Sequence, residues 1–117
     1  MMKPRRGQVW LVRFDPAVGQ EIQKTRPAVV MQDDSIGQLA LRIIVPVTDW
    51  KERYANFPWH THLSATATNG LEKESSADAL QVKSVSEDRF VRLLGSLAEE
   101  DLREVAAAIA LCVGYAE

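Results

Sequence analysis

The chain has 117 residues, of which 46% are hydrophobic and 26% are charged, and its formal net charge is −2. This length predicts one domain over residues 1–117, large enough to bury a core without disulfides or metal ions. The composition excludes a disordered chain, a collagen-like repeat and a coiled coil, and no apolar run approaches the ~20 residues that span a membrane. Cys112 is the one cysteine, and with no secretory signal in view it favours a cytoplasmic location. One cysteine and two histidines also leave a structural zinc site close to excluded.

The charges are distributed unevenly along the chain. Residues 1–53 carry nine Lys or Arg against six Asp or Glu, whereas residues 54–117 carry five against ten. Six of the basic residues lie within residues 1–26. The N-terminal half is therefore able to form a positive face for a polyanion such as RNA, although basic side chains more often only solvate a surface.

Up to residue 94, the pattern predicts short β-strands separated by turns. Residues 8–14 alternate in side-chain direction and are rich in strong β formers, and a proline ends this strand. A polar loop over residues 15–26 follows. Asn69-Gly70 is a strong turn signal between two later strands. The remaining predicted strands cover residues 27–32, 41–47, 58–64, 79–85 and 90–94.

The C-terminal segment predicts one amphipathic helix. Ser96 and Glu99 fit a capping box, as the N-cap and the N3 residue, and acidic residues in the first turn suit the helix dipole. Gly114 stands where a C′ glycine belongs. The apolar stripe consists of Leu102, Val105, Ala106, Ile109, Ala110 and Val113. Several short strands followed by one helix predict a small β-barrel or curled sheet with the helix packed on it.

Residues 19–27 concentrate polar and charged side chains in a loop between two strands, where function is often placed. Arg26 precedes Pro27, so its backbone is biased toward extended geometry, which helps to fix the direction of the guanidinium. The alternative is a solvated loop in which Glu21 and Lys24 form a weak surface ion pair. Spacing alone favours that alternative.

Two further clusters invite a chemical interpretation. Thr48 and Asp49 place a hydroxyl and a carboxylate at the end of an apolar strand, but composition alone favours strand termination with a local turn hydrogen bond. His60 and His62 lie two residues apart on a predicted strand and therefore share one face. They could act as acid and base on a phosphodiester, yet an exposed pair on a hairpin is the commoner arrangement.

Aromatic side chains could stack on nucleic-acid bases. Trp10 lies inside an apolar strand and is predicted to belong to the core, whereas Trp50 and Trp59 flank a polar loop and are better candidates for exposure. Cys112, near the apolar stripe of the helix, is predicted to pack and not to act as a nucleophile. No phosphate-binding glycine loop or dinucleotide fingerprint is present. The residues by themselves thus predict a small β-rich domain with a charged loop that suits an anion.

Several motifs follow one another along the chain in a fixed order. The first combines a strand, a turn and the Arg26-Pro27 pair, as GQVWLVRFDP, GQE and TRPAVV. The next motifs are VPVT over residues 45–48, HLS over 62–64, NGL over 69–71 and LQVKSV over 80–85. In these motifs the chain resembles the MazF/PemK toxins, the toxic partners of bacterial type II toxin–antitoxin pairs. The resemblance covers about residues 7–113.

This resemblance implies a fold and an activity. The fold is an SH3-like small β-barrel of the CcdB/PemK type, mainly β with a C-terminal helix, and usually a homodimer. The activity is that of an mRNA interferase, a sequence-specific endoribonuclease that cuts single-stranded RNA without a metal ion or other cofactor. The expected partner is a MazE-like cognate antitoxin, whose acidic C-terminal segment occupies the RNA groove.

Residue by residue, the family motifs imply a catalytic pair, Arg26 and Thr48, supported by the acidic Glu21. They also imply contacts with RNA by Gln20, Lys24, Thr25, Gln81 and Lys83. One position departs from the family pattern: many members have an acidic residue before the glutamine, where this chain has Leu80. Asp78 lies two residues earlier, so the acid–base role of this segment is not carried over.

Metal-free RNA cleavage uses the 2′-hydroxyl of the RNA as nucleophile and needs a base, charge stabilisation and an acid. Arg26 suits charge stabilisation because a guanidinium is always charged and forks onto two phosphate oxygens. Thr48 can donate a hydrogen bond to the same phosphate, and Glu21 is the nearest candidate base in sequence. The expected products carry 2′,3′-cyclic phosphate and 5′-hydroxyl ends. The alternative is a non-enzymatic toxin that binds DNA gyrase as the CcdB toxins do, because fold does not fix function.

Overall fold

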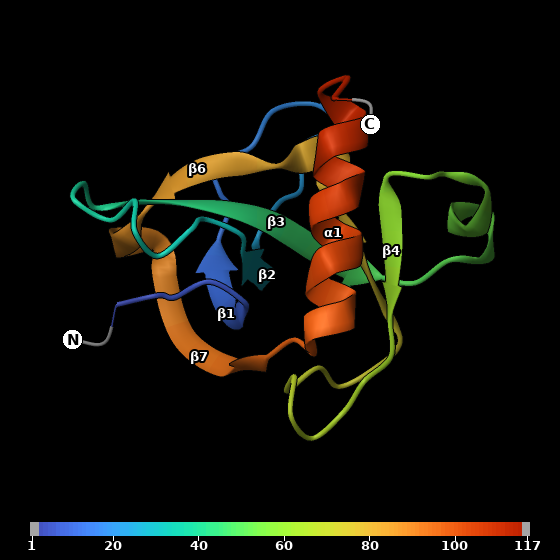
Figure 1. Ribbon diagram of the computed structural model, residues 1–117, viewed down its shortest axis with the longest axis horizontal. Helices are drawn as coiled ribbons and strands as arrows, with labels where there is room; N and C mark the ends of the chain where they lie inside the picture. Colours follow the sequence, from blue (N-terminus) through green and yellow to red (C-terminus); the bar gives the residue numbers. More distant parts are fainter. Residues whose placement is uncertain (1–2, 116–117) are drawn as a thin grey trace.

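A computed structural model describes residues 3–115, and within this range the chain forms seven β-strands, three short 3-10 turns and one α-helix (Figure 1). The strands are β1 (Gln8–Arg13), β2 (Thr25–Val30), β3 (Leu41–Asp49), β4 (His60–Leu63), β5 (Ser75–Asp78), β6 (Lys83–Ser86) and β7 (Phe90–Ser96). The 3-10 turns are η1 (Glu52–Asn56), η2 (Ala79–Gln81) and η3 (Glu87–Arg89), and the helix is α1 (Glu99–Cys112). In this part of the chain, α1 is too short to cross a membrane.

All strand pairs are antiparallel, in the order β4-β5-β3-β2-β1-β7, with β6 also paired to β3. Strand β3 is the longest and organises the sheet. It pairs with β2 along one edge, and with β6 and then β5 along the other. Among the described residues, the two terminal strands of this order are not paired with each other, so the curled sheet stays open. The predicted barrel-like β fold with a C-terminal helix is confirmed in this form.

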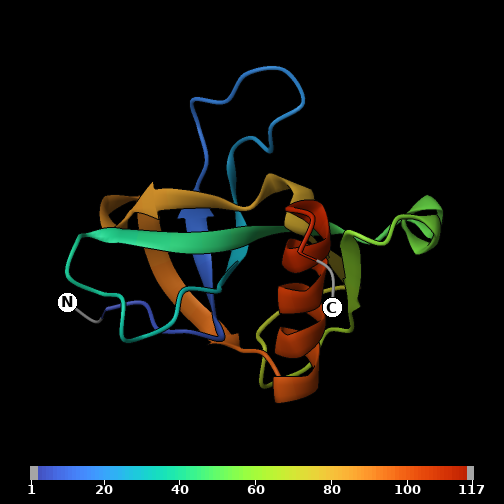
Figure 2. The same cartoon turned by 45° about the horizontal axis from the view of Figure 1, so that its top comes forward.

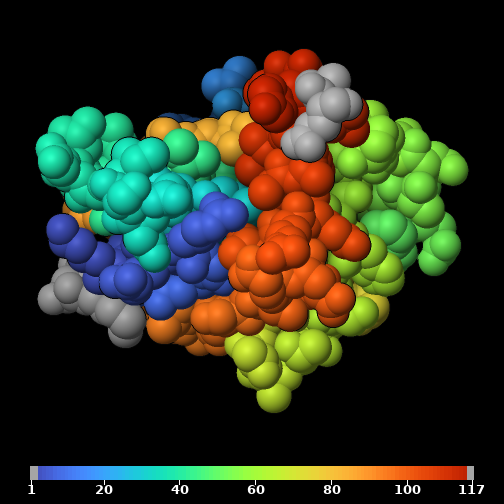
Figure 3. Space-filling view, viewed as in Figure 1, coloured from blue at the N-terminus to red at the C-terminus, as the bar shows by residue number. Residues whose placement is uncertain are grey.

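Apolar side chains pack on both faces of the sheet because successive strand residues point to opposite sides. On one face, Val9, Val29 and Val45 pack with Leu102 and Val105 of α1. Helix α1 crosses the middle of this face, with its outer side uncovered (Figure 3). Burial of this stripe, more than intrinsic helix propensity, therefore holds α1 in place.

The second face carries its own core. Trp10, Val12, Ala28 and Ile44 are buried there, and the indole of Trp10 contacts the ring of Phe90 edge-on at 5.6 Å. The predicted core position of Trp10 is therefore confirmed. The two cores fix β1, β2 and β3 from both sides, and so fix the strand ends from which the charged loops leave.

Five of the six predicted strands are found with ends shifted by at most two residues. The strand predicted over residues 79–85 is wrong in its first half, where the chain forms η2 instead. The cause is local: the side chain of Asp78 accepts a 3.2 Å hydrogen bond from the backbone N–H of Leu80 and caps the turn. Strand β5 is absent from the sequence-based expectation, because Ser-Ser-Ala-Asp has low β-propensity.

The predicted capping box at the start of the helix is also wrong. Ser96 still belongs to β7, and α1 begins at Glu99 after Ala98, whose side chain makes no cap hydrogen bond. The acidic first turn is present as predicted. At the other end, Gly114 has φ +77 just after the C-cap, as a C′ glycine requires. Val113 is exposed, so the apolar stripe ends before it.

Candidate active site

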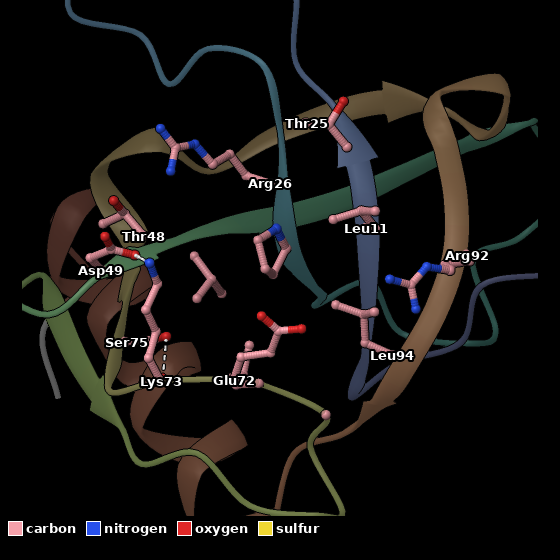
Figure 4. Close-up of a pocket in the computed structure, with 14 residues that line it drawn as sticks. Leu11, Thr25, Arg26, Thr48, Asp49, Glu72, Lys73, Ser75, Arg92 and Leu94 are labelled. Carbon is pink, nitrogen blue, oxygen red and sulfur yellow. Dashed lines mark hydrogen bonds and ion pairs between the residues drawn. The ribbon is translucent and has the colours of Figure 1, made fainter.

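A cavity of about 240 Å³ opens at the ends of β2 and β3. Arg26 and Thr48 both line it. In the β2–β3 ladder, Ala28 is paired with Pro46. Continuing this register by two residues on each strand places Arg26 opposite Thr48, and Figure 4 shows the two side chains on the same side of the cavity. The structure thus brings together the two residues that the family motifs imply as the catalytic pair.

Local contacts hold this pair in position. Both side chains are half-buried, and Arg26 Nε donates a 3.4 Å hydrogen bond to the backbone carbonyl of Gln23. Pro27 follows directly and sits in the β1–β2 ladder opposite Leu11. Thr48 is held by the pairing of β3 with β5, where it lies opposite Ser76. The guanidinium and the hydroxyl are therefore presented from two rigid strands.

An ion pair stands beside them. Lys73 Nζ lies 3.1 Å from Asp49 Oδ1, and both side chains line the cavity. Figure 4 shows them grouped with Arg26 and Thr48. Strand β3 ends at Asp49, as predicted, but the Asp49 carboxylate pairs with Lys73 and does not serve the local turn hydrogen bond that was expected there.

The loop that carries Lys73 is built rigidly. Asn69 is 3% exposed, and its side-chain oxygen accepts hydrogen bonds from the N–H groups of Thr66 and Leu71, both at 3.0 Å. Gly70 has φ +70, and a Cβ there would lie 2.1 Å from the carbonyl oxygen of Leu94. The predicted Asn-Gly turn is thus confirmed, and its glycine is required both by backbone angle and by contact with β7.

The rest of the cavity lining is mixed. Glu72 and Arg92 lie across from Arg26 and Thr48, and Arg92 projects from β7 (Figure 4). Apolar side chains, among them Val47, complete the wall. Because Asp49 and Lys73 neutralise each other, two guanidiniums and one carboxylate remain, and the cavity has a positive balance that suits an anion.

Glu21 lies apart from this cavity. It lines a second cavity of about 250 Å³ together with Gln81 and Lys83. The two cavities share none of their lining residues. The Glu21 carboxylate accepts a 2.6 Å hydrogen bond from the N–H of its own loop at Val18. The structure therefore does not bring Glu21 into the cavity of Arg26.

Side-chain hydrogen bonds of Gln81, in η2, hold the loop between β1 and β2 in place. Its side-chain oxygen accepts a 2.7 Å hydrogen bond from the N–H of Ile22, and its Nε2 donates to Asp78 at 3.1 Å and to the carbonyl of Gln20 at 3.5 Å. Figure 2 shows this loop, between β1 and β2, projecting from the sheet. Gln81 therefore positions the loop that precedes Arg26.

Lys24 is the last residue of the same loop, directly before β2. It has φ +68, in the left-handed region, and its N–H donates a 2.9 Å hydrogen bond to Asp15 Oδ1. Its carbonyl accepts a 2.7 Å hydrogen bond from the N–H of Phe14. The side chains of Lys24, Gln20 and Thr25 remain exposed, and Thr25 lines the cavity of Arg26.

Leu80, which replaces the acidic residue of many family members, is 62% exposed and lines the second cavity. Asp78 does not substitute for that acid at the surface. It is buried, caps η2 and lies with its Oδ1 4.0 Å from His60 Nε2. The carboxylate near this segment is therefore used for folding.

The two histidines share one face of β4, as predicted, but have different surroundings. His60 has a side chain 4% exposed, stacks on Tyr54 at 3.8 Å and contacts Ser76 Oγ at 2.7 Å through Nδ1. Burial lowers the pKa of His60, while the nearby charge of Asp78 opposes that shift. His62 is exposed and contacts Glu74 at 2.9 Å. Neither histidine lines either cavity.

The remaining aromatic and sulfur side chains are largely used within the fold. Trp50 stacks on His62 at 4.1 Å, and Trp59 on Phe57 at 4.9 Å, so both tryptophans are half-buried instead of free. Cys112 is a half-buried thiol, and burial raises its pKa, as expected for a packing residue. Within residues 3–115, no three His, Cys, Asp or Glu side chains cluster as metal ligands.

Sequence reasoning singled out Asp49 beside Thr48 but missed Lys73, Glu72 and Arg92 as lining residues of the first cavity. Lys73 precedes β5 by two residues, and β5 pairs with β3 at Asp49. Only a prediction of strand β5 would have indicated that Lys73 lies beside Asp49. Arg92 required the β1–β7 pairing in the same way.

An arginine, a threonine hydroxyl and a lysine–aspartate pair surround this cavity on an open, barrel-like sheet, and guanidinium and hydroxyl donors are groups that suit a phosphate. Comparison with known proteins defines the class. Residues 5–113 match the family model described as a PemK-like, MazF-like toxin of type II toxin–antitoxin systems. Endoribonuclease MazF9 of Mycobacterium tuberculosis is 35% identical over 113 residues, which cover 92% of this chain and 93% of that protein. The chain belongs to this family of toxins.

Other relatives agree with this assignment. Endoribonuclease MazF of Staphylococcus saprophyticus is 27% identical over 110 residues, which cover 94% of this chain and 91% of that protein. Among solved structures, MazF of Deinococcus radiodurans has a TM-score of 0.80 at 23% identity, with 97% of this chain and 99% of that one covered. A mycobacterial endoribonuclease in complex with its cognate antitoxin has a TM-score of 0.77 at 16% identity, with 97% and 98% covered. The predicted family and the predicted enzyme class, an endoribonuclease, are confirmed.

Proposed function

We propose that this toxin cleaves single-stranded RNA at specific sequences, without a metal ion, leaving 2′,3′-cyclic phosphate and 5′-hydroxyl ends. One observation carries the proposal: Arg26 and Thr48 line the same cavity from neighbouring strands. The endoribonuclease names of both curated relatives support it. The 2′-hydroxyl of the RNA is the nucleophile in this reaction, so the protein has to orient the phosphate and stabilise its added charge.

Arg26 and Thr48 are the catalytic pair in this proposal. The guanidinium binds two non-bridging phosphate oxygens, and its charge stabilises the phosphorane that forms when the 2′-oxygen attacks. The Thr48 hydroxyl donates a further hydrogen bond to the same phosphate. Both groups are already half-buried and held by strands, so little reorganisation accompanies binding.

The RNA path in this proposal passes from one cavity to the other around the end of β3. Thr25 contacts the RNA in the first cavity, and Glu21, Gln81 and Lys83 contact it in the second. The exposed side chains of Gln20 and Lys24 flank the path on the protruding loop. Glu21 supports binding from this distance and is not the base beside Arg26.

The partner in this proposal is a MazE-like antitoxin whose acidic C-terminal tail competes with RNA for the same groove. The mycobacterial neighbour was solved as an endoribonuclease in complex with its cognate antitoxin, and this supports such a pairing. The resemblance to the family supports a homodimer, and a shared compartment for RNA, toxin and antitoxin supports a cytoplasmic location.

The test is cleavage of a long labelled RNA by the purified protein with a chelator present. Cuts at one recurring sequence, lost in Arg26→Ala, are the expected result. End-group analysis of the fragments checks the cyclic phosphate. Intact RNA combined with inhibition of DNA gyrase would instead favour the non-enzymatic alternative, and mapping the cuts identifies the recognised sequence.

A further inference from the structure

We propose that the Asp49–Lys73 ion pair supplies the base and the acid of the cleavage reaction, which Arg26 and Thr48 do not provide. This inference rests on the proposed function of the same cavity. Asp49 takes the proton of the attacking 2′-hydroxyl, and Lys73 gives a proton to the leaving 5′-oxygen. Neither residue was implied by the family motifs.

The position of the pair carries the proposal. Asp49 directly follows Thr48 in β3, and Lys73 Nζ lies 3.1 Å from its carboxylate. Both line the cavity of Arg26 and Thr48, and the four side chains gather on one side of it (Figure 4). A phosphate bound by Arg26 and Thr48 therefore lies beside one proton acceptor and one proton donor.

The other acidic residues near the reaction are less suited to it. Glu21 lies in the second cavity, and Asp78 is buried as the cap of η2. Glu72 lines the same cavity but stands on the side away from Arg26 and Thr48 (Figure 4). Leu80 removes the acidic position that many family members have. Asp49 is thus the carboxylate that faces the phosphate site.

The pair adds little to folding. The side chains of Lys73 and Asp49 are 67% and 50% exposed, and exposed ion pairs contribute little to stability because solvent and salt screen them. The rigid Asn69-Gly70 turn and the β3–β5 ladder nevertheless hold the two groups together. Such precision in an exposed pair fits a role in chemistry better than one in stability.

The protons taken up and released in the reaction balance within the Asp49–Lys73 pair. As Asp49 takes the 2′-hydroxyl proton, the 2′-oxygen forms a bond to phosphorus. The bond from phosphorus to the 5′-oxygen breaks, its electrons stay on that oxygen, and Lys73 protonates it. Asp49 is then a carboxylic acid and Lys73 a neutral amine, and one proton transfer from Asp49 to Lys73 restores both. A lysine is a better proton donor than Arg26 because an ammonium releases its proton more readily than a guanidinium.

The experiment compares single-turnover cleavage by Asp49→Asn and Lys73→Gln with the wild-type protein. Each variant is expected to lose at least about 100-fold in rate, the usual contribution of a positioned acid or base. The matched controls are Glu99→Gln and Arg103→Gln, which break an exposed ion pair on α1, far from the cavity in sequence. Thermal unfolding of all four proteins checks that the fold is intact.

A second substrate separates the two roles. In RNA with sulfur in place of the bridging 5′-oxygen, the leaving thiolate needs no proton. Lys73→Gln is expected to cleave this RNA within about fivefold of wild type, whereas Asp49→Asn stays at least about 100-fold slower. A side chain with only a structural role would not produce this difference.

The outcomes are distinguishable. Wild-type rates in both variants, or an equal defect of Lys73→Gln on both substrates, would overturn the assignment of the pair. In either case, cleavage by the wild type and its loss in Arg26→Ala leave the proposed function standing. Failure of the wild type to cut any RNA would overturn the proposed function itself.

Discussion

Two regions of this toxin bring together a hydroxyl, a carboxylate and a lysine or histidine side chain, and they have opposite environments. At the end of β3, Thr48 stands with the exposed Asp49–Lys73 pair on an open cavity. Between β4 and β5, Ser76 Oγ lies 2.7 Å from His60 Nδ1, but Ser76 is 0% exposed. Ser76, His60 and the neighbouring Asp78 are residue types typical of a hydrolytic triad. No substrate can reach the buried hydroxyl of Ser76, however.

The comparison shows that a functional site is identified better by solvent access, and by polar groups that are not already hydrogen-bonded within the fold, than by residue types. The oxygens of Asp78 are already used by Leu80 and Gln81, and the ring of His60 is stacked on Tyr54. Buried polar groups of this kind stabilise a fold only when they satisfy one another. The groups at the first cavity, by contrast, project into open space from the ends of β2 and β3 and from the loop before β5.

We expect the largest loss of cleavage from substitutions in the exposed region. Arg26→Ala and Thr48→Ala should each reduce cleavage by at least about 100-fold, because each removes an oriented donor at a developing charge, worth about 2.7–4 kcal/mol. Both residues lie at strand ends and are only half-buried, so thermal unfolding should change little. Near wild-type rates in a folded variant would exclude that residue from catalysis.

Changing the buried region should have the reverse effect. The double variant His60→Gln, His62→Gln should keep cleavage within about tenfold of wild type, with no limb near pH ~6.5 in the pH–rate profile. Its stability should fall by about 1–3 kcal/mol, because Ser76 loses a buried hydrogen-bond partner. Urea unfolding and cleavage assays measure the two effects separately. A larger loss of activity in a stable protein would move the active site to β4.

The pH dependence of stability should come from the same buried histidine. Burial lowers the pKa of His60 below 6.5, so the unfolded chain binds its proton more readily than the folded protein does. Stability from this group is therefore full above about pH 6.5 and falls as the pH drops toward the lower, folded pKa. Between pH 7 and 5, the Tm should decrease by a few degrees, and less in His60→Gln. An equal decrease in both proteins, with His62→Gln as the control, would assign the effect to other groups.

The sequence was informative where local chemistry decides the structure. Alternating apolar residues predicted β1, and the family motifs that include Arg26 and Thr48 named two residues that line one cavity. The Asn69-Gly70 turn also followed from local backbone preference, since a left-handed residue is needed there.

The sequence was uninformative where distant segments meet. The capping of η2 by Asp78 removed half of a predicted strand, and the unpredicted β5 brought Lys73 to Asp49. Glu21 was expected to support Arg26, as a family acidic position and the nearest candidate base in sequence, but the two residues line different cavities. Strand register and long-range pairing decide these positions, and neither is encoded in the spacing of residues within one segment.

The smallest expected effect concerns the partner and extends the comparison to the whole surface. The positive excess of residues 1–53 includes Lys24, whose exposed side chain stands on the loop next to the cavity of Arg26. An acidic antitoxin tail that imitates RNA should be steered toward it, and this steering is screened over ~8 Å at physiological salt. Lys24→Glu should therefore slow association several-fold at low salt and less at high salt.

Charge reversal at Glu99 or Glu100, at the start of α1, provides the matched control for this effect. Both residues are exposed and lie on a different element, so their reversal should leave the association rate unchanged or slightly faster. Stopped-flow association with the tail peptide at two salt concentrations measures all three variants. Equal slowing by the three, or no dependence on salt, would mean that the antitoxin docks away from the cavity, and competition between tail and RNA would then need another cause.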